Sequence, residues 1–134
     1  MPSKWIAISC IALLWACKSH KTVTAVPTKD LIFGEGGGFT GAVQTWVLHS
    51  NGNIDSAVQD SLVFTGRSIP ASEAAELIKE AETLLSEARK TEAGNYYYFL
   101  SVSGQEIPLS AYFMEEETGY MAMYRRLQRR CLGR

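Results

Sequence analysis

The sequence predicts an α+β domain in which a largely antiparallel sheet of about four strands is covered on one face by two helices. Three observations predict this class: β-forming residues alternate around an Asn-Gly turn, one long amphipathic helix follows, and a second pair of β-rich stretches comes after that helix. Sequential hairpins give an antiparallel sheet, and helices with one apolar stripe must cover it. The expected order is strand, strand, helix, strand, strand, helix.

The first half of the sheet is expected between residues 31 and 65. The short apolar run 31–33 is able to start a strand and leads into the glycine-rich stretch 34–41. Residues 42–48 alternate between two faces and predict a strand. The pair Asn51-Gly52 favours the positive φ values of a type I′ hairpin turn. Residues 54–65 are therefore expected to form one return strand, with a break near its middle.

The clearest element is a helix over residues 71–91, where apolar side chains recur at three- and four-residue steps along one stripe. Two strands are expected after it, over 96–103 and 106–113. Because Pro108 cannot donate a ladder hydrogen bond, the second of these should lie at an edge of the sheet or begin there. A weaker helical period covers residues 118–130.

The first 16 residues are typical of an export signal. Lys4 supplies a positive start, and the uncharged apolar run from Trp5 to Ala16 is shorter than the roughly 20 residues that a spanning helix needs. Leu14-Trp15-Ala16-Cys17 resembles the bacterial lipobox. That resemblance implies cleavage between Ala16 and Cys17 and a diacylglyceryl thioether on Cys17, which anchors the protein to a membrane. The alternative is an ordinary signal peptide that ends by accident at a cysteine.

The expected organisation is a signal peptide (1–16), a lipidated cysteine with a flexible tether (17–30) and a single α+β domain (31–132). By resemblance to Gram-negative sorting patterns, Lys18 after the cysteine favours the outer membrane. The chain is thus expected in the cell envelope. Of the three cysteines, one lies in the signal peptide and one is the lipid site. Cys131 is therefore expected to have no partner for a disulfide, so the hydrophobic core alone must stabilise the domain.

The candidate partner-binding loop is a glycine-rich stretch composed of Gly36, Gly37, Gly38, Phe39, Thr40 and Gly41. Its letters match G-x-G-x-x-G, but a dinucleotide site needs a helix directly after the glycines, and residues 42–48 predict a strand. We therefore expect no nucleotide. Two interpretations stay open: a bulge or tight bend that needs positive φ, or a bare backbone that a partner approaches closely.

No pattern of residues predicts catalysis or metal binding. His20 lies in the tether and His49 beside the hairpin turn, where an exposed side chain is expected, and no Cys or His cluster has ligand spacing. Residues 115–117 are expected to form a solvated acidic loop; the alternative is a cation site, although the run lacks the 1-3-5 ligand spacing of a calcium loop. The tyrosines at 96–98 supply core or sheet-face aromatics, or a stacking surface for a sugar or peptide. We expect no enzyme, no metal and no cofactor.

The charge pattern also argues against nucleic-acid binding. The formal net charge is −1, and nucleic acids require a concentrated basic face. The arginines near the C-terminus complement the dipole of the last predicted helix, which favours a solvated helix end. The alternative for this cluster is a site for an anionic ligand or a lipid headgroup.

Several motifs together resemble known proteins. They are Gly-Gly-Gly-Phe-Thr-Gly at 36–41, Asn51-Gly52, Gly94-Asn95 followed by Tyr97-Tyr98-Phe99-Leu100, and Met123-Tyr124-Arg125-Arg126-Leu127. This set looks like small lipoproteins of the Bacteroidota. More distantly, the loop at 37–41 and the helix start at 70–77 resemble the emfourins, small proteins that inhibit thermolysin-like metalloproteases. The emfourin strand that bears a histidine runs Ile-Pro-Leu-Ser here, at 107–110, so no inhibitory residue is carried over.

The function expected from these observations is that of a lipid-anchored binding module of the envelope. The emfourin resemblance implies that its partner is a protease, which the module inhibits; another envelope protein is the other possible partner. The alternative function is that of a non-catalytic structural or assembly subunit of an envelope complex, which docks through the sheet edge near Pro108 or through an aromatic face.

Overall fold

The structure is a computed structural model of the 134-residue chain, and it describes residues 28–58, 61–87 and 94–134. In chain order the elements are β1 (Leu31–Gly37), β2 (Val43–Leu48), β3 (Asn53–Val58), β4 (Ser61–Ser68), α1 (Ala71–Ser86), β5 (Tyr96–Val102), β6 (Leu109–Phe113), α2 (Thr118–Leu127) and a closing π-helical turn (Gln128–Leu132). The predicted signal peptide, with Ala16, and Cys17 lie outside the described residues.

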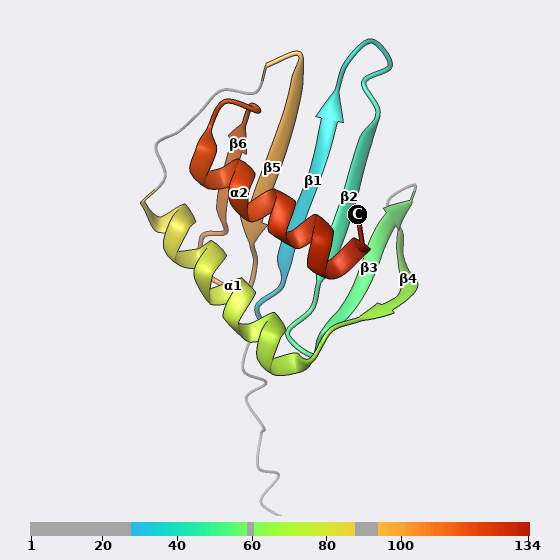
Figure 1. The fold of residues 1–134 in the computed structure, drawn as a ribbon, viewed down its shortest axis with the longest axis vertical. Helices are drawn as coiled ribbons and strands as arrows, with labels where there is room; N and C mark the ends of the chain where they lie inside the picture. The colour runs from blue at the N-terminus through green and yellow to red at the C-terminus, as the bar shows by residue number, and fades with distance from the viewer. Residues whose placement is uncertain (1–27, 59–60, 88–93) are drawn as a thin grey trace, which may run out of the picture.

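One antiparallel sheet organises the described part of the chain. Its six strands lie in the order β4-β3-β2-β1-β5-β6, and each neighbouring pair is antiparallel. Helices α1 and α2 lie across the same face of this sheet (Figure 1). The predicted α+β class, with an antiparallel sheet and two helices, is confirmed.

The predicted count of about four strands and the predicted order were wrong, for two reasons. The apolar run 31–33 was expected only to start a strand, and the candidate loop was expected to begin at Gly36, but β1 continues to Gly37. The single return strand expected over 54–65 is in fact two strands, β3 and β4, which pair with each other. The order is therefore four strands, a helix, two strands and a helix.

Strand β1 occupies the centre of the sheet although three of its seven residues are glycine. A Cβ atom on Gly34 would lie 2.1 Å from the carbonyl oxygen of Gln44 and 2.6 Å from the ring of Phe99. One on Gly36 would lie 2.8 Å from the hydroxyl oxygen of Tyr97. Aromatic rings of β5 thus cover the glycines of β1 and fill the space that side chains would otherwise occupy.

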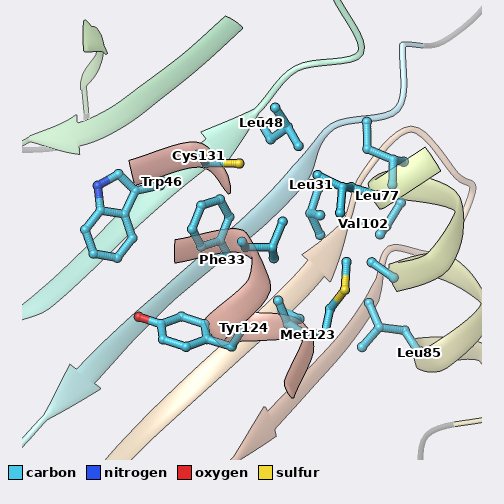
Figure 2. Packing of buried hydrophobic residues seen from close by; sticks show 14 of the residues in the cluster. Leu31, Phe33, Trp46, Leu48, Leu77, Leu85, Val102, Met123, Tyr124 and Cys131 are labelled. Carbon is cyan, nitrogen blue, oxygen red and sulfur yellow. The ribbon is translucent and has the colours of Figure 1, made fainter. Parts of the chain in front are cut away.

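The core lies between the sheet and the two helices (Figure 2). Phe33 of β1 stacks against Trp46 of β2, with 5.7 Å between ring centroids, and meets the ring of Tyr124 edge-on at 6.3 Å. The buried side chains of the described residues all fall between Leu31 and Leu132. A chain that starts at residue 18 therefore contains this whole core.

Helix α1 begins at Ala71, as the periodicity predicts, and ends at Ser86. Its buried side chains form one stripe against the sheet, made of Ala74, Leu77, Ile78, Ala81 and Leu85. The expected end at residue 91 falls among residues 88–93, which are outside the described part of the chain. The predicted stripe is confirmed where the structure describes it.

The second half of the domain follows the sequence prediction closely. Strand β5 covers nearly the whole expected range, and β6 starts at Leu109, directly after Pro108. Strand β6 forms an edge of the sheet, as the proline predicts. Helix α2 covers most of the range expected, and the π-helical turn continues it to Leu132.

None of the helices within residues 28–58, 61–87 and 94–134 combines the length and the apolar character that crossing a bilayer requires.

Candidate binding site at the β1–β2 hairpin

The glycine-rich stretch forms the hairpin that joins β1 to β2, at the upper end of the sheet in Figure 1. Gly37, Gly38 and Gly41 have φ values of 95°, 74° and 63°, which favour glycine over other residues. The amide of Gly37 donates to the carbonyl oxygen of Ala42 at 3.2 Å, and that of Gly41 to Gly38 at 3.2 Å. The interpretation as a tight bend that needs positive φ is thus confirmed.

The loop also leaves an apolar side chain in solvent. The ring of Phe39 is fully exposed, and among the described residues only the chain neighbours of Gly41 have atoms within 4 Å of where its Cβ atom would be. The amide of Gly38 donates to the carbonyl oxygen of Asn95 at 2.5 Å, which ties the base of the loop to the start of β5. The hairpin therefore presents a large apolar group on a short, well-anchored turn.

The G-x-G-x-x-G string is followed by a strand. Ala42 leads directly into β2, which starts at Val43, so the helix whose N-terminus receives the pyrophosphate of a dinucleotide is replaced by extended chain. The expected strand over 42–48 is confirmed to within one residue at its start.

A hollow of about 250 Å³ opens beneath the loop. It is lined by Glu35, Gly36, Gly37, Thr40, Ala42, Val43, Gln44 and Tyr96. Three members of the predicted loop thus meet a carboxylate, an amide and a phenol that come from β1, β2 and β5. Sequence reasoning missed Glu35, Gln44 and Tyr96 as members of this site. The available signal was that Glu35 is the one charged residue between Leu31 and Leu48.

Three tyrosines gather around Glu35. The hydroxyl of Tyr124 donates to Glu35 Oε2 at 3.3 Å. The ring of Tyr98 lies 4.9 Å from that of Tyr124 and 5.5 Å from that of Tyr96. Burial, together with the charge of Glu35, raises the pKa of Tyr96 and lifts that of Tyr124 well above its usual range. The phenol of Tyr124 therefore stays protonated and donates its hydrogen bond to the carboxylate.

His49 lies between two carboxylates, so the expectation of an exposed turn residue was wrong. Its Nδ1 is 3.2 Å from Asp30 Oδ1, and its Nε2 is 2.9 Å from Asp55 Oδ2. Hydrogen bonds and attraction from Asp55 and Asp30 outweigh the opposing effect of burial and raise the pKa of His49 above 6.5. The side chain of His49 links the residue before β1 to β3.

Within the described ranges, no group of three or more Cys, His, Asp or Glu side chains is placed so that it could hold a metal ion.

Most of the arginines near the C-terminus form ion pairs with glutamates. Arg125 pairs with Glu115 at 3.1 Å, Arg126 with Glu80 at 2.6 Å, and Arg130 with Glu73 at 2.5 Å. These pairs join α2 and the π-helical turn to other elements. They favour the solvated helix end over a site for an anionic ligand.

The sheet face opposite the helices carries apolar side chains of its own. From β5 and β6 come Tyr97, Phe99 and Tyr112, whose rings contact one another with centroids 5.6 to 6.3 Å apart. At the other edge, Leu62 and Phe64 of β4 are more than half exposed. This face is a second surface on which a partner could pack.

In comparisons with protein-family models, curated proteins and solved structures, nothing matches this chain. The resemblances to Bacteroidota lipoproteins and to emfourins therefore stay predictions.

Proposed function

We propose that the protein is a lipid-anchored binding module of the cell envelope that holds a protein partner with the β1–β2 hairpin. The observation that carries the proposal is the fully exposed ring of Phe39 on a turn fixed by three glycines with positive φ. Burying such a ring in a partner gains about 1.5–3 kcal/mol relative to leaving it in water. Because the turn is anchored to β2 and β5, little conformational entropy is lost when a partner binds.

Affinity capture with matched variants tests this proposal. The protein is used as bait on detergent-solubilised envelopes, with Phe39→Ala as the test variant and Ile107→Ala as the control. Ile107 is also strongly exposed but belongs to the turn at the opposite end of the sheet. The specific partner should be recovered at least about tenfold less with Phe39→Ala and unchanged with Ile107→Ala. Equal recovery with all three baits rules the hairpin out as the binding surface.

The inhibitory version of the proposal follows the emfourin resemblance and has its own assay. Residues 18–134, which contain the whole packed core, are mixed with thermolysin-type proteases at micromolar concentrations. Slower cleavage of a peptide substrate, lost in Phe39→Ala, supports inhibition through the hairpin. If the rate stays the same for every protease of this type, the partner is not such a protease.

The sheet face opposite the helices favours a second candidate function, that of a structural or assembly subunit. Tyr97, Phe99 and Tyr112 at one edge and Leu62 and Phe64 at the other supply apolar area that a permanent partner would bury. A stable stoichiometric partner that Phe64→Ala releases and Phe39→Ala retains would favour this candidate over the first.

A further inference from the structure

The hollow beneath the hairpin is lined by a carboxylate, an amide and a phenol, from Glu35, Gln44 and Tyr96. We propose that it binds an arginine side chain of the protein partner, with Glu35 as the counter-charge and the ring of Tyr96 as a stacking surface. The inference rests on the proposed function, since it names the chemistry of the partner that the hairpin holds.

Glu35 is the charged side chain that lines the hollow. Its side chain is partly buried, yet within the described residues it makes no ion pair with a lysine or arginine. Removing a carboxylate from water without a cationic partner costs free energy. A cation that enters the hollow recovers that cost and adds a charge-assisted hydrogen bond.

The carboxylate is fixed before a ligand arrives. The hydroxyl of Tyr124 donates to Oε2 at 3.3 Å, and Glu35 lies opposite Tyr98 of β5 in the sheet. Tyr124 belongs to α2, so this hydrogen bond reaches the carboxylate from the helix layer. A carboxylate has about four lone-pair positions in all, so acceptor capacity remains for a donor that enters through the hollow.

The other groups around the hollow suit a guanidinium better than an ammonium. The ring of Tyr96 is about half exposed, and a planar guanidinium stacks on such a ring as well as binding a carboxylate in a fork. Thr40 and Gln44 line the same space and carry oxygen acceptors for the remaining N–H groups. The exposed Phe39 lies in the same loop as Thr40, so one partner segment can contact both.

The experiment is a nuclear magnetic resonance titration of the ¹⁵N-labelled protein purified from cells in detergent micelles. The probes are N-acetyl-arginine amide and its neutral isostere N-acetyl-citrulline amide, with N-acetyl-glutamate amide as the acidic control. Arginine should give saturable shifts at the amides of Gly36, Gly37 and Gln44, with an affinity about tenfold higher than citrulline, the size expected for one charge-assisted hydrogen bond.

The variants separate charge from structure. Glu35→Gln keeps an acceptor for Tyr124 and should weaken arginine binding about tenfold. Glu106→Gln removes an exposed carboxylate at the opposite end of the sheet and should change nothing. For the unaltered protein, added salt should weaken arginine binding and leave citrulline unaffected, which keeps the test valid if Glu35→Gln does not fold.

Three results would overturn the inference: equal affinity for arginine and citrulline, preference for the acidic probe, or shifts confined to residues away from the hairpin. The two proposals fail separately. Capture that depends on Phe39 without arginine binding sinks only the arginine site. Arginine binding without capture that depends on Phe39 sinks the hairpin as the partner surface.

Discussion

At the scale of single residues, His49 shows how a turn residue acquires a structural task. Both of its ring nitrogens face carboxylates. A neutral imidazole has one donor and one acceptor nitrogen, so only the doubly protonated ring satisfies Asp30 and Asp55 together. The charged form is therefore favoured in the folded state, which agrees with a pKa raised above 6.5.

This arrangement predicts a pH dependence of stability. Because the folded-state pKa of His49 is raised, its contribution is complete below pH 6.5 and is lost as the pH rises through the folded-state value. Urea unfolding of the unaltered protein should give a free energy about 1 kcal/mol higher at pH 6 than at pH 8.5. In His49→Gln most of that difference should vanish. The assignment fails if both proteins show the same dependence.

The glycines of β1 make a second prediction at this scale. Gly34→Ala places a methyl group against the carbonyl oxygen of Gln44 and the ring of Phe99, so unfolding should become easier by about 3 kcal/mol. The matched control is Gly119→Ala in α2, where the new methyl group would lie 3.8 Å from the nearest side-chain atom of another element, Cδ1 of Leu84. That variant should be stabilised by about 0.5 kcal/mol. Thermal unfolding measures both, and a tolerated Gly34→Ala would mean that β1 is not packed as described.

Glu35 belongs to the part of the site that sequence reasoning did not reach. The predicted loop starts at Gly36, and the tight bend and its positive φ values are as expected. The carboxylate matters only because the register of β1 with β2 and β5 places it opposite Gln44 and Tyr98. Such long-range pairing is not encoded in any local pattern of residues.

At the scale of elements, the sequence predicted correctly the helices and strands whose structure depends on their own residues. The stripe of α1 and the alternation of β2 follow from periodicity, and the edge position of β6 follows from Pro108. Only the start of β1, at 31–33, was expected, because the glycines that follow argue against a strand. Its conformation is decided by aromatic rings of β5 that lie more than 60 positions away in the sequence.

The π-helical turn that follows α2 yields a prediction of its own. It buries Cys131, and this burial, together with nearby Glu73 and against the effect of Arg130, raises the pKa of the thiol to about 11. In residues 18–134 at pH 8, iodoacetamide should label the native thiol at least about a hundredfold more slowly than the thiol of the urea-unfolded chain. Equal rates would show that the turn opens readily, and Cys131→Ala provides the blank.

At the scale of the whole molecule, the sequence suggests where the protein is located, and the structure suggests which surface binds a partner. The described domain supplies a packed core and a hairpin with an exposed ring, whereas Cys17 lies outside the described residues. We predict that protein extracted from membranes begins at residue 17 and carries a thioether-linked diacylglyceryl group, as intact mass would show. Cys17→Ser should abolish this modification and membrane retention. Protein recovered from the cytosol with Met1 attached would contradict the proposed address.

The most direct test of the central claim is photo-cross-linking in living cells from the hairpin itself. A benzophenone-bearing phenylalanine analogue replaces Phe39 in one strain and Ile107 in another, so that two exposed apolar positions at opposite ends of the sheet are compared. The account predicts a discrete protein adduct from position 39 and none from position 107. Equal adducts from both positions, or adducts from position 107 alone, would contradict it.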